Sequence, residues 1–338
     1  MQQTWLAAIK SDPTSTLLSS DNKAVEYFTK RDLLGQRVQA LDYVWQLPEV
    51  QKIFQKQQPD GSWKHSGKET VSYPKYQYYL VQTWKTYRKL VEQYQVNKKH
   101  EGARKAAEFL LSCQTGLGDI RGMLANQYAT YYTGAMLALL VKSGYENDPR
   151  IKQGFNWLLS IRQNDGGWTI PILTHKFDRK TFYNLTSQYE EPVEPDSSKP
   201  FSHNWTDMVL RAFAAHPKYR NCKEALKAAD LLKSSFFQPD YYSSLKDSKY
   251  WVRFLFWWPN LVTALDSLSL MGYPKEDPDI KKALSWLVKN QLPNGLWKLT
   301  YSKKTVKTEN SNEKSRGECL WLTLTIAKIF KRLYRDNC

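Results

Sequence analysis

The feature that most constrains this chain is a short turn, a Gln followed by Gly-x-Trp, that recurs after segments of helical periodicity. Complete copies run from Gln58 to Trp63, from Gln163 to Trp168 and from Gln291 to Trp297. An Asp-Pro pair precedes the helical segment of the last two copies. This pair is typical of a helix start, because Asp caps the first N–H groups and Pro fits the first turn. Such internal repetition predicts a series of helical hairpins, each closed by the same turn.

A second kind of helix alternates with these amphipathic segments and is apolar on nearly every side. A helix that is apolar all round is buried, so the alternation predicts an inner and an outer ring of helices. The predicted inner helices span residues 76–91, 128–141, 205–215, 261–271 and 320–333.

The expected fold class is therefore all-α, an α/α toroid of about five to six helical hairpins. We expect residues 45–338 to form the toroid, with a polar and Pro-rich inserted loop at about 169–200. Residues 1–44 are expected to form an N-terminal helical segment that packs on it, with a helix near 24–34.

These turns resemble the QW motifs of squalene–hopene cyclases. The alternating helices resemble the α/α toroid that those cyclases share with protein prenyltransferases, and the resemblance covers roughly residues 45–335. The chain departs from both groups. It lacks the Asp-x-Asp-Asp motif with which class II terpene cyclases protonate their substrate, and no His follows His216 to complete a prenyltransferase zinc site. The resemblance implies a single-toroid, terpenoid-cyclase-like protein, for which we expect no metal and no cofactor.

Aromatic residues make up 14% of the chain and cluster at the same end of each predicted inner helix. A core alone would spread them evenly, so we expect these helix starts to line a central ligand cavity. The predicted ligand-binding residues are Arg121, Gln127, Tyr128, Tyr131, Tyr132, Trp205, Arg253, Phe254, Trp257 and Trp321.

Four residues are candidates for catalysis. His203 is the only His beside a predicted inner-helix start, and Asp207 lies one turn later, where the two could pair. Asp119 lies in a degenerate turn that has lost its Trp, and broken local rules are expected at functional sites. Glu318 begins the last inner helix. Each has a structural alternative: a hydrogen-bonded His, a helix-end Asp, a salt bridge from Asp119 to Arg121, or a pair between Glu318 and Arg316.

Three functions stay open at this point. The aromatic cavity could bind an isoprenoid or another largely apolar ligand, and could cyclise or transfer it, because ring faces stabilise carbocations. A polysaccharide lyase or a glycoside-acting enzyme could use the same rings for stacking on sugars. A non-catalytic toroid that binds a ligand or a protein is the third possibility.

The net charge of +16, from 49 basic and 33 acidic residues, fits an anionic ligand or a solvated basic surface. No nucleic-acid-binding motif accompanies it. No apolar run reaches the ~18–20 residues of a membrane-spanning helix, although peripheral membrane contact is compatible with the charge. The N-terminus does not resemble a signal peptide, and the four Cys are widely separated. We therefore expect a cytoplasmic protein.

Overall fold

The structure is a computed structural model that describes residues 4–67, 75–188, 190–242, 248–255, 257–301 and 313–335. Within these ranges every regular element is a helix, and the extended pairings are isolated bridges. The predicted all-α fold class is confirmed. The chain divides into two compact units: a central unit, Trp45–Leu231, and a terminal unit that combines Met1–Val44 with Leu232–Cys338.

The expected alternation of helices is confirmed in chain order. An outer helix, a turn and an inner helix follow one another five times in the described ranges. The outer helices are α4 (Pro48–Phe54), α6 (Glu101–Ser112), α8 (Pro149–Ser160), α11 (Lys223–Ser234) and α13 (Pro278–Lys289). The inner helices are α5 (Lys75–Tyr94), α7 (Thr130–Leu140), α10 (His203–Ala215), α12 (Leu261–Leu270) and α14 (Glu313–Leu333).

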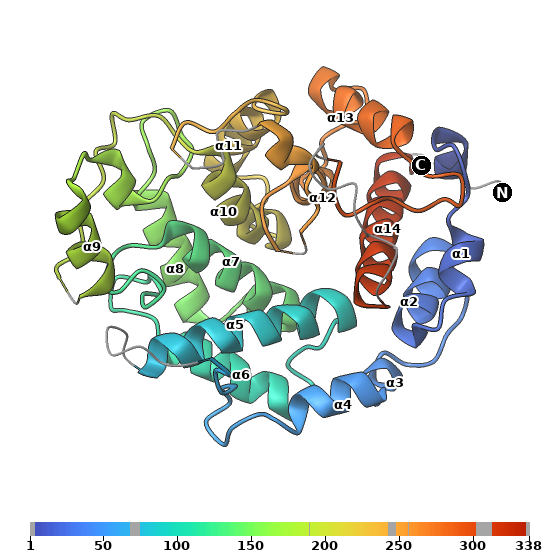
Figure 1. Cartoon of the computed structure of the whole chain (residues 1–338), viewed down its shortest axis with the longest axis horizontal. Coiled ribbons are helices and arrows are strands. Elements are labelled where there is room, and N and C mark those ends of the chain that lie inside the picture. The colour runs from blue at the N-terminus through green and yellow to red at the C-terminus, as the bar shows by residue number, and fades with distance from the viewer. Residues whose placement is uncertain are drawn as a thin grey trace. The chain divides into compact units, whose positions relative to one another are not determined.

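In the central unit, α5, α7 and α10 lie next to one another, with α6 and α8 packed behind them (Figure 1). Every residue of α7 except Tyr132 is buried, as expected for a helix that is apolar all round. Gly134 lets α10 approach α7 closely, because a Cβ at this position would lie 2.6 Å from the Cα of Val209. The unit also contains η3 (Val141–Tyr145), η4 (Pro171–Thr174) and α9 (Arg179–Ser187), the last two in the predicted insertion.

In the terminal unit, the N-terminal residues pack on α14 and on the turn before it. The short elements are η1 (Thr4–Ala8), α1 (Thr14–Leu18), α2 (Lys23–Phe28), η2 (Thr29–Leu33), α3 (Asp42–Trp45, at the boundary between the units) and η5 (Ser248–Val252). Near the C-terminal end of α14, Lys331 donates to the backbone oxygens of Asp32 and Leu33 at 2.7 and 2.9 Å. At the turn, Gln291 donates to the backbone oxygen of Ser11 at 2.7 Å.

The three complete turns share one set of hydrogen bonds. Each Trp donates its indole N–H to the backbone oxygen ten residues earlier, at 2.7 to 2.8 Å. Each Trp also donates its backbone N–H to the hydroxyl of a Thr on the inner helix that follows, at 2.8 to 3.2 Å. These threonines are Thr83, Thr206 and Thr323. A buried N–H group needs such a partner, so each turn is fixed to the outer helix before it and to the inner helix after it.

The glutamine of the first turn is Gln57, so the assignment of Gln58 to this role is wrong. The side chain of Gln57 donates to the backbone oxygens of Gly61 and Gly102, at 2.9 and 2.8 Å. Gln114 makes the equivalent pair of bonds to Gly118 and Arg150. Gln57 lies six positions before its Trp, as Gln291 lies six positions before Trp297. The side chain therefore closes its own turn and also holds the backbone of a later segment.

The degenerate turn keeps this geometry without its Trp. Ile120 is fully buried and donates its backbone N–H to the Thr133 hydroxyl at 3.1 Å. Gly118 has φ +107°, and a Cβ there would lie 2.5 Å from the backbone oxygen of Gln153 on α8. Only the indole hydrogen bond has been lost.

We predict that Gly118→Ala destabilises the protein by at least about 2 kcal/mol, because it adds left-handed backbone strain to a clash with α8. The matched control is Gly116→Ala, two residues earlier in the same turn, where a Cβ would meet no atom within 4 Å. Urea unfolding should give the control a stability within about 0.5 kcal/mol of the wild type. Equal losses in both variants would contradict the role of Gly118.

Candidate functional site

The loop after the degenerate turn is held by a buried ion pair. Asp119 is fully buried and accepts a hydrogen bond from the Arg121 guanidinium, with Nε and Oδ2 2.8 Å apart. Its other carboxylate oxygen accepts from the hydroxyl of Thr115. Arg121 also lies over the Tyr128 ring, with its Cζ 4.8 Å from the ring centroid. Asp119, Arg121 and Tyr128 thus come together, in the salt-bridge arrangement that was the structural alternative for this loop.

The inserted segment is fastened to this loop. Tyr128 donates its hydroxyl to the Glu194 carboxylate at 2.8 Å. Gln127 donates to the backbone oxygen of Glu191 at 3.1 Å and accepts from the backbone N–H of Val193 at 2.9 Å. Burial, the hydrogen bond to Glu194 and the charge of Glu194 together raise the pKa of Tyr128 to about 12. Gln127 and Tyr128 therefore position the insertion.

We predict that Tyr128→Phe reduces the loss of stability at alkaline pH. An unfolded Tyr ionises near pH 10, whereas folded Tyr128 keeps its proton to about pH 12. Between these values the folded state binds the extra proton, so stability falls as the pH rises. Urea unfolding from about pH 9 to 11.5 should show that the free energy of unfolding falls less steeply with pH in Tyr128→Phe than in the wild type. The control is Tyr183→Phe, at a 60% exposed position, and a wild-type slope in both variants would contradict the prediction.

The aromatic side chains of α5, α7 and α10 form one continuous cluster. The Tyr131 ring lies 4.2 Å from that of Tyr132 and 4.5 Å from that of Trp205, centroid to centroid. The Trp84 ring stands edge-on to Tyr132 at 4.9 Å. Trp84, Tyr131 and Trp205 are buried, while Tyr132 is half-buried. Burial raises the pKa values of both tyrosines, so both phenols are neutral at physiological pH.

Arg88 lies at the edge of this cluster, and Arg211 lies close enough for its charge to act on Arg88. The Arg88 guanidinium lies over the Trp84 ring, with its Cζ 4.6 Å from the ring centroid. Burial lowers the pKa of Arg88, the Glu92 carboxylate raises it, and the charge of Arg211 lowers it again. An arginine nevertheless stays protonated in proteins. On α10, Arg211 forms an ion pair with fully buried Asp207, with Nη2 and Oδ2 2.6 Å apart. The cluster therefore combines ring faces with two guanidinium groups.

His203 lies in the first turn of α10 and is buried. Ser202 caps this helix by accepting the backbone N–H of Trp205 at 3.3 Å. Because Asp207 is engaged with Arg211 one turn further on, its carboxylate belongs to an ion pair within the helix. Any catalytic role of His203, Asp207 or Asp119 stays a prediction.

The other predicted residues belong to the terminal unit. Phe254 is buried and packs edge-on against the Trp286 and Tyr301 rings at 6.1 and 6.0 Å. Arg253 is half-buried, and its backbone forms an isolated bridge with Thr300. Trp257 lies edge-on to Trp258 at 4.4 Å.

Glu318 and Trp321 lie on α14, where Trp321 contacts the Phe28 ring at 6.1 Å. The pair considered between Glu318 and Arg316 is not formed, because residues two apart on a helix do not face each other. In the described ranges neither side chain takes part in an ion pair. The roles proposed for Arg253, Phe254, Trp257, Glu318 and Trp321 stay predictions.

Trp84, Arg88 and Arg211 are not among the residues predicted from the sequence. The available signal was a charge inside a predicted inner helix that is otherwise apolar, since a buried Arg needs an anion or an aromatic face. The spacing of four between Trp84 and Arg88 also predicts that the two side chains meet on one helix face.

The part of the chain that the structure describes contains no group of three His, Cys, Asp or Glu side chains that could hold a metal ion. In the same ranges, no helix is long and apolar enough to cross a membrane.

No protein-family model and no curated protein sequence matches this chain. Among solved structures it is similar to a protein from Actinoplanes, with 14% identity, 98% of this chain and 90% of that chain covered, and a TM-score of 0.46. It is also similar to a variant of the type II terpene cyclase MstE from Scytonema, in complex with its substrate geranylgeranyl dihydroxybenzoate. That match has 12% identity, covers 98% of this chain and 86% of the cyclase, and has a TM-score of 0.42. Similarity at this level leaves function to be argued from the residues.

Proposed function

We propose that this protein is terpenoid-cyclase-like in function and binds an isoprenoid or another largely apolar ligand beside the aromatic cluster of α5, α7 and α10. The observation that carries the proposal is the continuity of the Trp84, Tyr132, Tyr131 and Trp205 rings, with Arg88 over the Trp84 ring and Arg211 close enough for its charge to act on Arg88. Ring faces suit an apolar chain or a carbocation. The guanidinium groups suit an anionic head such as a diphosphate.

The paired carboxylates favour binding or transfer over cyclisation that begins with protonation. Protonating an alkene requires a carboxylic acid that still carries its proton. Asp207 and Asp119 each form an ion pair with an Arg guanidinium, so both carboxylates already have a cationic partner. In this proposal Asp207 orients Arg211 toward the ligand, and Asp119 orients Arg121.

The alternatives depend on how accessible the rings are. A polysaccharide lyase or another glycoside-acting enzyme stacks sugars on exposed rings in an open cleft, whereas Trp84, Tyr131 and Trp205 are 1 to 7% exposed. This burial supports an apolar ligand over a sugar. A non-catalytic toroid would bind the same apolar ligand without turnover, so an assay for products separates it from an enzyme.

We predict that Arg88→Gln weakens binding of geranylgeranyl diphosphate at least about tenfold, because it removes one charge-assisted contact to the diphosphate. The matched control is Lys85→Gln, an exposed position on the same helix, which should bind as the wild type does. Calorimetric titration measures the affinities. Circular dichroism of each variant checks that the fold is retained.

Mass spectrometry after incubation with prenyl diphosphates, squalene and acidic polysaccharides tests for turnover. Turnover of a polysaccharide with no binding of an isoprenoid would overturn the proposal. Binding without any product would assign the protein to the non-catalytic class.

Peripheral contact with an anionic membrane is a second part of the proposal, because an apolar ligand has to be taken from a lipid phase. On and just before α9, Phe177, Phe182 and Tyr183 are 36 to 60% exposed. Lys176, Arg179 and Lys180 are exposed beside them. Exposed aromatics interleaved with basic residues are typical of helices that lie in a membrane interface. A cytoplasmic location stays a prediction.

We predict that the protein binds vesicles containing phosphatidylserine more tightly than vesicles of phosphatidylcholine alone, and that salt weakens the binding. The double variant Phe182→Ser/Tyr183→Ser should reduce vesicle binding at least about fivefold in co-sedimentation. It removes the apolar side chains that would be buried in the membrane interface. The control is Leu117→Ser, another exposed apolar position in the central unit. Equal binding by the double variant and the wild type would contradict a role for α9.

A further inference from the structure

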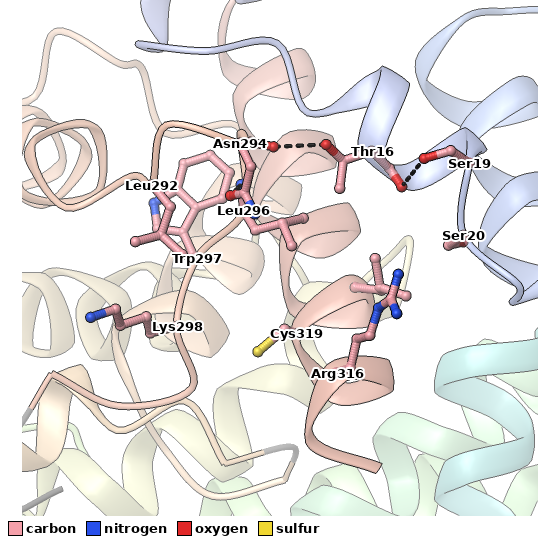
Figure 2. Close-up of a pocket in the computed structure, with 11 residues that line it drawn as sticks. Thr16, Ser19, Ser20, Leu292, Asn294, Leu296, Trp297, Lys298, Arg316 and Cys319 are labelled. Carbon is pink, nitrogen blue, oxygen red and sulfur yellow. Dashed lines mark hydrogen bonds between the residues drawn. The ribbon is translucent and has the colours of Figure 1, made fainter. Parts of the chain in front are cut away.

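The terminal unit contains a pocket of about 330 Å³. Three segments line it: α1 with the two residues after it, the turn that ends at Trp297, and the first turns of α14 (Figure 2). None of the predicted site residues lines this pocket. Its volume is at the lower end of the range for small-molecule sites.

One wall of the pocket is apolar. Leu292 and Leu296 line it together with fully buried Trp297, and Leu320 on α14 is a further apolar lining residue of the pocket. The indole N–H of Trp297 already donates to the backbone oxygen of Leu287 at 2.8 Å, so the ring offers the pocket only an apolar surface. This wall suits a hydrocarbon chain.

The opposite wall is polar, and its hydroxyls are engaged. Thr16 donates to the backbone oxygen of Asn294 at 2.8 Å, and Ser20 donates to that of Leu17 at 2.8 Å. The bond from Ser19 to the backbone oxygen of Thr16 is long, at 3.3 Å, so this hydroxyl can turn toward a ligand at little cost.

Arg316 supplies the positive charge. It extends from the first turn of α14 toward the side of the pocket where Ser19 and Ser20 lie (Figure 2). Its guanidinium is in no ion pair with a carboxylate of the described residues. Lys298 is a second cation among the lining residues, and it is exposed at the rim. Among the described residues that line the pocket there is no Asp or Glu.

We propose that this pocket binds a small amphipathic carboxylate, with the carboxylate paired to the Arg316 guanidinium and the chain along Leu292, Leu296 and Leu320. The planar guanidinium matches a carboxylate through two parallel hydrogen bonds. If each heavy atom takes up about as much space as a water molecule, ~30 Å³, the pocket holds about ten such atoms. A carboxylic acid of about eight to ten carbons has this size.

Cys319 makes the proposal testable, because this half-buried thiol lines the pocket. The probe is sodium decanoate, and the measurement is the rate of alkylation of each cysteine by N-ethylmaleimide, resolved by peptide mass spectrometry. Decanoate should slow the alkylation of Cys319 at least about fivefold and leave Cys222, a half-buried thiol of the central unit, unchanged. Decanol has the same chain and no charge, so the concentration needed for the same protection should be at least about tenfold higher.

Arg316→Gln should raise the decanoate concentration needed for protection at least about tenfold. The matched control is Lys314→Gln, an exposed position two residues earlier on α14 that does not line the pocket, and it should behave as the wild type does. Arg88→Gln should also leave the protection unchanged, which separates this site from the one proposed in the central unit. Calorimetric titration of Cys319→Ser with decanoate gives the affinity without the thiol.

Three outcomes would overturn the proposal: no protection of Cys319 by decanoate, equal protection by decanol, or equal weakening in Lys314→Gln and Arg316→Gln. Because Arg316 is exposed, its substitution is expected to leave the fold intact, which circular dichroism checks.

Discussion

In four of the turns, a backbone N–H donates to a Thr on the following inner helix, and the rest of the structure depends on this hydrogen bond. It fixes the turn to the buried helix, while the indole of the Trp fixes it to the outer helix before it. Ile120 retains the first bond and loses the second, and its turn still forms. The threonine contact is therefore the more general of the two, and the Trp adds to it.

The fold class could be predicted from the sequence, because the turn motif and the apolar inner helices repeat over most of the chain. The threonines could not be predicted, since Thr83 or Thr206 is one polar residue among apolar neighbours until the helix is placed against its turn. The sequence pattern alone does not separate Gln58 from Gln57, because the two glutamines are adjacent and fit it almost equally well. Only the bonds that Gln57 makes to Gly61 and Gly102 separate them.

The site was predicted in part. Proximity along one helix identified Tyr131 and Tyr132, and the broken turn identified the ion pair of Asp119 with Arg121. Contacts between helices were beyond the sequence, because they depend on which faces of α5, α7 and α10 meet. For this reason the contact of Tyr132 with Trp84 could not be predicted, whereas the contact of Arg88 with Trp84 lies within α5 and follows from their spacing of four. The ring cluster and its arginines nevertheless support the class of ligand that the aromatic composition first suggested.

The bond from Gln291 to the backbone of Ser11 joins residues that are 280 positions apart. At the equivalent place in the other repeats, Gln57, Gln114 and Gln163 hold segments that come 33 to 45 positions later in the chain. Here the partner, Ser11, is synthesised 280 positions before Gln291, so the bond can form only after Gln291 has been made. Residues 4–18 thus act as the last outer element of the C-terminal repeat, although they are made before any other part of that repeat. Closure of so long a loop is entropically costly and slow, so the terminal unit is expected to complete its folding only after residues 232–333 have been synthesised.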